Sequence, residues 1–251
     1  MWLYKKYMKK VDILNKINAI PHDKFPHNIL IIPDGNGRWA KKQGKNVSFG
    51  HRKASYVIKD IINDLKDLDE IETLTIWGFS ADNWKRSKIE VNSLMSIFSF
   101  MVNDLYKDLI RDETRFIHIG RKDRIPKKLA DILQKVEFET KDLKKRILAL
   151  AIDFGGEDQM IRMIDKARTL SKDITINKDI LESLKDGAGI IHTSDLIIRT
   201  SGEVRTSDIG WFNGKETELY FLDKLFPDVK TEDILDAIID FSKRERRMGK
   251  R

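Results

Sequence analysis

The stretch that decides the fold reads Asn28-Ile29-Leu30-Ile31-Ile32-Pro33-Asp34-Gly35-Asn36-Gly37-Arg38-Trp39-Ala40. It opens with a short apolar run that is typical of a buried strand, and a glycine-rich segment follows at once. Gly35 and Gly37 permit backbone conformations that aim successive N–H groups at an anion, and Arg38 adds a charged donor fork. A strand that ends in such a loop indicates a binding site for a diphosphate.

Strands and helices alternate along the rest of the chain. Strands are expected at residues 28–32, 72–79, 115–119, 147–154, 196–199 and 218–222, and helices at 51–68, 89–109, 126–143, 157–170 and 231–246. This alternation predicts an α/β fold, a single domain with a mainly parallel central sheet flanked by helices. In such sheets the active site lies at the carboxyl ends of the strands.

No linker or internal repeat divides the chain, so we expect one domain over residues 27–251 after an N-terminal amphipathic extension, residues 1–26. Apolar residues from Leu3 to Ile17 recur there at helical spacing, with lysines between them. Such a helix could lie on a membrane surface or pack on its own domain, and we favour packing.

The composition restricts the function classes. A net charge of +7 over 251 residues suits an anionic partner, but it does not choose among phosphate, nucleic acid and an acidic membrane surface. The absence of cysteine excludes disulfides, thiol catalysis and thiolate-bound zinc, and it favours a cytoplasmic setting. No apolar run reaches the length of a membrane-spanning helix, and the N-terminus does not read as a secretory signal.

The glycine segment also matches the loose dinucleotide-binding fingerprint, with Asp60 at about the distance of a ribose-binding acid. Three observations argue against a dinucleotide. A helix is expected to begin only near His51, well after the glycines. Asp34 would repel a pyrophosphate unless a cation lay between them. Bulky side chains follow Gly37, where that fold needs close packing between helix and strand.

Three further polar segments add to the site. Residues 80–86 close the second strand and read Ser80-Ala81-Asp82-Asn83-Trp84-Lys85-Arg86. Residues 199–207 follow a later strand and surround a glycine with two arginines and several hydroxyl groups, which forms a second anion cradle. Glu218 begins the last strand, and together with Asp34 it could hold Mg²⁺, which proteins bind through one or two carboxylates plus substrate phosphates. The Walker-type loop of ordinary NTPases is absent from the sequence.

These segments together resemble the cis-prenyltransferases, the undecaprenyl diphosphate synthase family. The resemblance runs from about His27 to Gly249. It rests on residues 27–40, Phe49-Gly50-His51, residues 79–86, residues 199–207, Glu218-Leu219-Tyr220-Phe221 and Arg244-Glu245-Arg246-Arg247-Met248-Gly249. It implies an α/β domain with a hydrophobic tunnel, usually dimeric, that condenses isopentenyl diphosphate with an allylic prenyl diphosphate. The reaction would depend on Mg²⁺ and give a cis-polyprenyl diphosphate.

The resemblance also implies roles for individual residues. Asp34 and Asn83 would be catalytic, Asn83 as a candidate in proton removal, and Asp34 and Glu218 would hold Mg²⁺. The substrates would be bound by Gly35, Asn36, Gly37, Arg38, Trp39, His51, Ser80, Ala81, Asp82, Trp84, Arg86, Arg199, Arg205, Thr206, Ser207, Arg247 and Gly249. Arg247 and Gly249 would reach an active site across a homodimer. The other expected partner is a membrane, contacted peripherally, and no nucleic acid is expected.

Two departures from the family pattern leave alternatives open. Typical members carry an arginine where this chain has Val47, so one contact to the allylic diphosphate is missing or is supplied by Lys45 or Asn46. Residues 211–217 lack the usual apolar run, which affects dimer geometry and product length. The alternatives are a single irregular condensation, a non-catalytic subunit of a heteromeric enzyme and, more distantly, a dinucleotide-binding oxidoreductase.

Product length is expected to depend on the floor of the site. Gly78 is small and would leave room beneath the site, whereas Phe98, Phe100 and Met101 on the following helix could close the tunnel.

Overall fold

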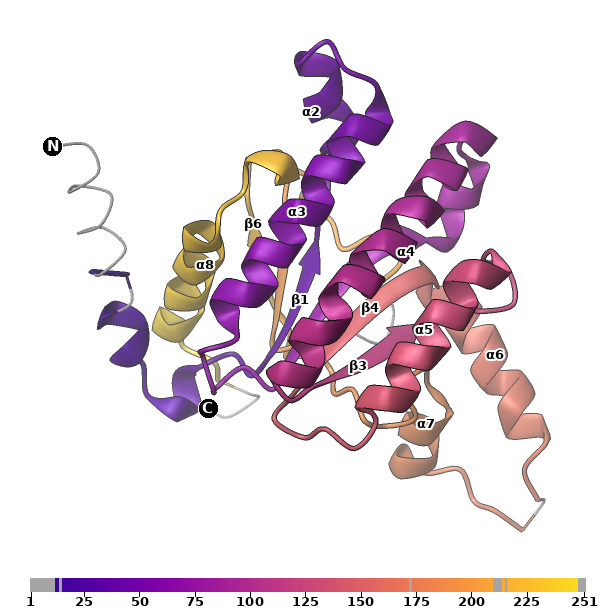
Figure 1. Cartoon of the computed structure of the whole chain (residues 1–251). Coiled ribbons are helices and arrows are strands. Elements are labelled where there is room, and N and C mark those ends of the chain that lie inside the picture. The colour runs from indigo at the N-terminus through magenta and orange to yellow at the C-terminus, as the bar shows by residue number, and fades with distance from the viewer. Residues whose placement is uncertain (1–11, 14, 172, 210–213, 215, 248–251) are drawn as a thin grey trace, which may run out of the picture.

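Six strands form one sheet in a computed structural model, which describes residues 12–13, 15–171, 173–209, 214 and 216–247. They are β1 (Asn28–Ile32), β2 (Thr73–Ser80), β3 (Thr114–Ile119), β4 (Arg146–Phe154), β5 (Leu196–Arg199) and β6 (Glu218–Phe221). Their order is β3-β4-β2-β1-β5-β6, and every neighbouring pair is parallel (Figure 1). The predicted α/β fold is confirmed, and β1 and β5 have the predicted bounds.

The helices that connect these strands begin at recognisable caps. They are α2 (Asn36–Lys42), α3 (Val47–Leu65), α4 (Lys88–Arg111), α5 (Lys127–Thr140), α6 (Gly156–Arg168), α7 (Lys178–Leu184) and α8 (Thr231–Lys243), with single turns η2 (Ala81–Lys85) and η4 (Phe226–Asp228). The side chain of Asn46 accepts a hydrogen bond from the N–H of Phe49, which explains why α3 begins four residues before the predicted start. The short helix α7 was not predicted.

Helix α2 corrects one prediction. The sequence suggested that no helix would begin before His51, but α2 begins at Asn36, inside the glycine segment. Gly35 precedes it with φ +96°, and a Cβ there would lie 2.8 Å from the side chain of Leu225. A Cβ on Gly50 would lie 2.1 Å from the carbonyl oxygen of Asn36, so this glycine lets α3 pack closely against α2. The late-helix argument against a dinucleotide loop is therefore wrong.

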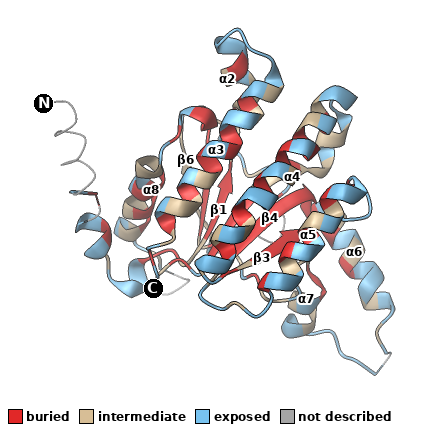
Figure 2. Ribbon diagram, viewed as in Figure 1, coloured by how far each residue is buried: buried red, intermediate tan, exposed pale blue. Residues whose placement is uncertain are grey.

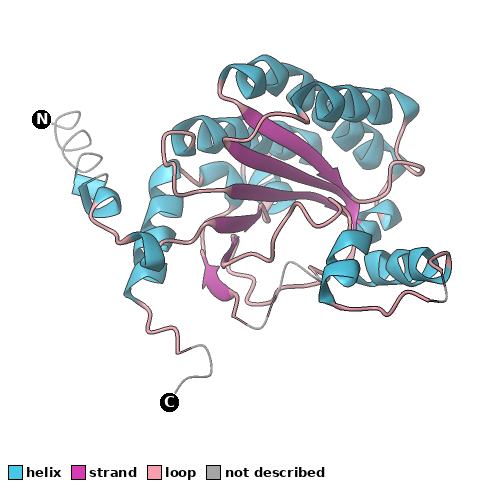
Figure 3. Cartoon of the chain, turned by 90° about the horizontal axis from the view of Figure 1, so that it is seen from below, coloured by secondary structure: helices cyan, strands magenta, loops and turns pink. Residues whose placement is uncertain are grey.

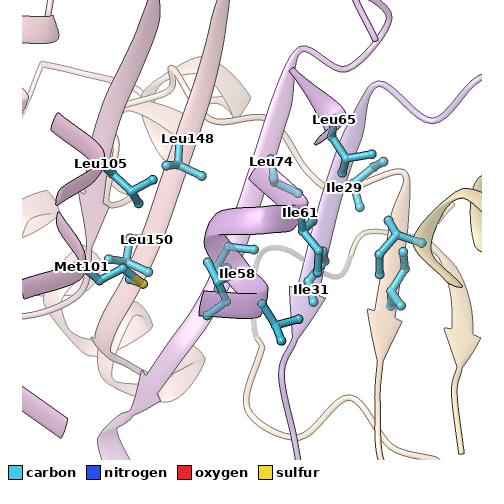
Figure 4. Packing of buried hydrophobic residues seen from close by; sticks show 14 of the residues in the cluster. Ile29, Ile31, Ile58, Ile61, Leu65, Leu74, Met101, Leu105, Leu148 and Leu150 are labelled. Atoms are coloured by element: carbon cyan, nitrogen blue, oxygen red, sulfur yellow. The ribbon is translucent and has the colours of Figure 1, made fainter. Parts of the chain in front are cut away.

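The sheet is buried on both faces except at its edge strand β6, whose residues are partly buried (Figure 2). Along β1, Ile29 and Ile31 join the larger core, which the sheet shares with α3, α4, α5 and α8 (Figure 4). Leu30 and Ile32 join a smaller core on the opposite face. A view along the sheet shows most helices gathered on one side of it (Figure 3).

The predicted packing of the N-terminal extension is supported where the structure describes it. Ile13 and Ile17 are buried in the larger core. The rest of the amphipathic pattern, Leu3 to Val11 and Leu14, lies outside the described residues.

Candidate active site

A pocket of about 520 Å³ opens at the carboxyl edge of the sheet, where β1, β2 and β5 end. Most of the predicted site residues line it. They are Asp34, Gly35, Asn36, Gly37, Arg38, His51, Ser80, Ala81, Asp82, Asn83, Arg86, Arg199 and Ser207. Segments far apart in the sequence therefore meet, because parallel strands bring their carboxyl ends to one edge.

Asp34 lies at the centre of the pocket's hydrogen bonding. Its backbone N–H donates to the hydroxyl of Thr200 at 2.9 Å, which ties the end of β1 to the loop that follows β5. One carboxylate oxygen accepts the N–H of Gly35 at 2.6 Å, and the other lies 3.1 Å from a guanidinium nitrogen of Arg199. The side chain is 33% exposed, so a ligand or ion can still reach it.

Arg199 is held in place before any substrate arrives. Its side chain is only 6% exposed, and Nη1 donates to the Ser207 hydroxyl at 2.7 Å and to the Arg205 carbonyl oxygen at 2.6 Å. Its Nε–H is buried without a hydrogen-bond partner. A buried cation with an unused donor favours an anionic ligand, since an unmade hydrogen bond is costly there.

Arg38 connects the two anion loops, which are residues 34–38 after β1 and residues 199–207 after β5. Its guanidinium donates to the Ser201 hydroxyl at 2.6 Å, lies 3.0 Å from a carboxylate oxygen of Glu203, and lies 3.6 Å from one of Asp34. Ser201 has φ +78°, an uncommon conformation for a residue other than glycine. The side-chain oxygen of Asn36 is buried in the pocket wall without a partner.

Asn83 presents a donor rather than an acceptor to the pocket. Its side-chain oxygen accepts the backbone N–H of Ser80 at 3.2 Å, which fixes the orientation of the amide on η2. The amide NH₂ therefore faces a ligand as a donor. This arrangement suits a diphosphate oxygen better than proton removal, and both roles of Asn83 remain predictions.

Glu90 is a pocket residue that sequence reasoning missed. Its Oε1 lies 3.3 Å from Nε2 of His51 and 2.9 Å from Nη1 of Arg86, so it joins two predicted ligand-binding groups. Burial lowers the pKa of His51, and the hydrogen bond from Glu90 opposes that shift. Its spacing of four residues from Arg86 on a helix start was the signal that could have found it.

Trp77 and Asp208 also line the pocket without having been singled out. The indole N–H of Trp77 donates to the Phe154 carbonyl oxygen at 3.3 Å. The carboxylate of Asp208 accepts the N–H of Glu157 at 3.1 Å, which ties the loop after β5 to the start of α6. No sequence signal marked Asp208, because its role depends on a contact between distant segments.

Besides Arg247, four predicted substrate-binding residues do not line this pocket. Trp39 stacks on Phe49 and donates its indole N–H to Asp228 at 2.7 Å. Trp84 packs edge-on against Phe79 in the core. Arg205 and Thr206 lie on the loop that follows β5, next to the pocket residue Ser207. The exposed side chain of Arg205 pairs with Glu203.

Glu218, the second predicted metal ligand, and Arg247 lie at the opposite edge of the sheet from the pocket. Glu218 is the first residue of β6 and is in register with the first residue of β5, whereas Asp34 follows the last residue of β1. Its carboxylate pairs with Arg244 at 2.6 Å. Arg247 follows α8 near the same edge, with an exposed side chain. One chain therefore does not bring these residues to the pocket, and Gly249 lies outside the described residues.

The Val47 departure is not compensated by its neighbours. Val47 lines the pocket, but Lys45 and Asn46 do not. Lys45 lies over the ring of Phe49, and Asn46 caps α3. The allylic diphosphate would therefore lack this cation.

The space beneath Gly78 is filled by Phe98. A Cβ on Gly78 would lie 2.9 Å from the Phe98 ring, and Phe98 and Met101 are both buried. Phe100 is 61% exposed and lies outside the core, so the expectation that it closes a tunnel is wrong for this conformation. The tunnel itself remains a prediction.

The described part of the chain offers few ligands for Mg²⁺. It contains no group of three or more His, Asp or Glu side chains that could cage a metal. The partly exposed carboxylate of Asp34 does fit a Mg²⁺ ion that keeps water and substrate phosphate oxygens as its other ligands.

No helix among the described residues is long and apolar enough to cross a membrane.

The parallel sheet and the paired anion loops define a class of α/β enzyme that handles diphosphates. The family model described as putative undecaprenyl diphosphate synthase matches residues 32–249. An isoprenyl transferase of Aquifex pyrophilus is 39% identical, over 90% of this chain and 97% of its own. A tritrans,polycis-undecaprenyl-diphosphate synthase (geranylgeranyl-diphosphate specific) of Pyrococcus horikoshii is 32% identical, over 99% and 93%.

A solved structure agrees with these relatives. Lavandulyl diphosphate synthase from Lavandula x intermedia, in complex with dimethylallyl diphosphate, superposes with a TM-score of 0.82 at 32% identity and covers 89% of this chain and 98% of its own. The chain therefore belongs to the undecaprenyl diphosphate synthase family and is a prenyltransferase.

Proposed function

We propose that the enzyme condenses isopentenyl diphosphate with an allylic prenyl diphosphate, repeatedly and with Mg²⁺, to give a cis-polyprenyl diphosphate. The observation that carries this proposal is the pairing of two anion loops across Asp34. One loop ends β1 and presents Arg38, and the other ends β5 and presents Arg199. Two adjacent cradles suit two diphosphates better than one nucleotide.

We assign the allylic diphosphate to residues 35–38 and the wall of His51 and Arg86, and isopentenyl diphosphate to Arg199 and Ser207. Breaking the allylic C–O bond increases the charge on the departing diphosphate. Guanidinium and amide donors that are already in place stabilise that charge more in the transition state than in the ground state. Mg²⁺ held by Asp34 would neutralise diphosphate charge as a Lewis acid.

The second half of the reaction depends on placement. Holding the alkene of isopentenyl diphosphate against the allylic carbon makes carbon–carbon bond formation effectively unimolecular. One proton must then leave to form the new double bond. Because the oxygen of Asn83 already accepts the N–H of Ser80, we assign the proton to the released diphosphate, to water or to Asp34.

A homodimer is part of the proposal. Glu218 and Arg247 are remote from the pocket of their own chain, so a second copy must supply them if they act there. Met160, Ile161 and Ile164 form an exposed apolar stripe on α6, which a second copy would cover. Light scattering that gives a monomer at assay concentration would remove this part.

A single condensation is the second candidate. It is favoured by Phe98, which fills the floor under Gly78, and by the missing cation at Val47. A non-catalytic subunit is disfavoured, because Asp34, Arg38, Asn83 and Arg199 are retained and assembled.

One assay distinguishes repeated elongation from a single condensation. The pure protein is incubated with Mg²⁺, labelled isopentenyl diphosphate and allylic primers of graded length, and the products are sized by chromatography. A ladder of products supports repeated elongation, whereas one product of fixed length supports the second candidate. No incorporation with any primer would overturn both.

A further inference from the structure

The segment that carries the first anion loop also carries an unusual charge distribution. Residues 35–59 contain seven lysines and arginines and no aspartate or glutamate, which equals the net charge of the whole chain. Arg38 and Lys59 are used in ion pairs, Arg38 in the pocket and Lys59 with Asp104. The other five cations are not needed for the pocket.

Those five cations lie on the outer surface of α2 and α3. Lys41, Lys42, Lys45, Arg52 and Lys53 are all exposed, and none forms an ion pair with a described residue. His51 faces the pocket, whereas Arg52 and Lys53 follow it in the chain and face solvent. The exposed cations therefore belong to the same two helices, and to the turn between them, that supply Arg38, Val47 and His51 to the pocket wall.

Aromatic side chains are interleaved with these cations. Phe49 and Tyr56 are 45% and 49% exposed, and they share one stripe of α3 with Arg52 and Lys53 because their spacings are three, four and seven residues. Tyr56 and Arg52 also line a groove of about 330 Å³ between α3 and α4, whose other lip is the exposed Phe100. Half-exposed aromatic rings beside unpaired cations are typical of a surface that rests on lipid headgroups.

We propose that this face docks on an anionic bilayer surface; it consists of Lys41, Lys42, Lys45, Arg52 and Lys53 with Phe49, Tyr56 and Phe100. Charge complementarity selects the occupant, since unpaired lysines and arginines are attracted to acidic headgroups while the aromatic rings enter the interfacial layer. The contact places the mouth of the pocket next to lipid. Its use in handing over an apolar product rests on the proposed function, but the contact itself does not.

The test is sedimentation of the full chain with vesicles of phosphatidylglycerol and phosphatidylcholine, compared with phosphatidylcholine alone. The intact protein is expected to sediment with the anionic vesicles and to be released by salt. The variant K41E/K42E/K53E should bind more weakly by roughly fivefold for each lysine, on the order of 100-fold in total. Its prenyl transfer to a short primer should be unchanged, because these three side chains lie outside the pocket.

A matched control separates the face from net charge. The variant K24E/K144E/K178E makes the same charge change at exposed lysines outside α2, α3 and α4, and it should keep most of the binding. The double variant Y56S/F100S should bind anionic vesicles less tightly while keeping the salt dependence. Circular dichroism checks that each variant is folded.

Several outcomes would overturn the proposal. Equal losses in the two triple variants would show that only net charge matters. Equal binding to neutral vesicles would exclude an electrostatic contact. Binding that is lost on deleting residues 1–20 but kept in K41E/K42E/K53E would assign the membrane contact to the N-terminal extension. Capture by heparin without sedimentation with vesicles would identify a soluble polyanion as the partner instead.

Discussion

The two edges of the central sheet differ in how their charged residues are arranged. At the carboxyl edge, Asp34 and Arg199 meet in a pocket, although 165 residues separate them in the sequence. At the amino edge, Glu218 is paired with Arg244 and remains far from Asp34. The difference follows from chain direction: a residue that follows a parallel strand reaches the ligand edge, and a residue that begins one does not.

The largest effect is expected at the carboxyl edge. Asp34→Ala should lower kcat by about 10³-fold or more, because the site loses the carboxylate that we propose holds Mg²⁺ and that pairs with Arg199. Turnover is measured with saturating primer and Mg²⁺. Asp34→Asn is the matched variant of similar shape and should be nearly as slow. Full activity of a folded Asp34→Ala protein would remove this residue from the mechanism.

Arg199→Ala should have the next largest effect. Truncating a buried, hydrogen-bonded cation costs about 3 kcal/mol, which corresponds to roughly 100-fold in kcat/KM. Because we assign Arg199 to isopentenyl diphosphate, the KM of that substrate should rise more than the KM of the primer. An equal rise for both substrates would contradict the assignment. Arg205→Ala is the control, since its exposed side chain pairs with Glu203 at the surface, and it should lose less.

Glu218→Ala tests whether the amino edge acts in a second copy. If Glu218 completes a site across the dimer, the variant should lose activity without losing its fold. Mixing it with Asp34→Ala should then restore activity, because half of the sites in a mixed dimer contain neither change. Failure of the mixture to exceed its two components would place Glu218 in a structural role with Arg244.

The smallest effect is expected from Glu90→Gln. Removing this charge should weaken kcat/KM by roughly tenfold, the value of about one hydrogen bond to a charged group. The pKa of His51, already below 6.5 because of burial, should fall further, and NMR titration measures it. Stability from neutral His51 is present above pH 6.5 and declines as the pH falls below it, because the unfolded chain then binds more protons. A raised pKa in Glu90→Gln would contradict this arrangement.

The sequence predicts those features that depend on residues close together in the chain, and it misses those that depend on contacts between distant segments. Apolar runs predicted β1 and β5 to the residue, and polar segments after strands predicted most of the pocket. Helix α2 was missed because its seven residues are too few to show helical periodicity and the glycines around it favour a turn. Glu90 was missed although its spacing of four residues from Arg86 is a local signal. Asp208 was missed because its partner Glu157 lies on another element, and spacing in the chain does not reveal such a contact.

The same limit explains why some residues were predicted to lie in the pocket and do not. Trp39 and Trp84 belong to segments on which the family resemblance rests. Their rings, however, pack against Phe49 and Phe79 and do not line the pocket. Glu218 was joined to Asp34 by chemistry alone, without regard to which end of β6 it occupies. Strand direction, read together with strand order, would have separated them.

Arg38 and Arg199 already have acidic or hydroxyl partners within the chain, and this has a consequence for selectivity. The Nε–H of Arg199 is unused, but an anion that takes the other guanidinium nitrogens must break bonds to Glu203 or Asp34, and this costs free energy. A diphosphate can engage both arginines at once and recover that loss, whereas orthophosphate reaches one at a time. The abundant inorganic phosphate of a cell should therefore compete poorly for this site. The ion pairs of the unliganded enzyme thus favour diphosphate over orthophosphate.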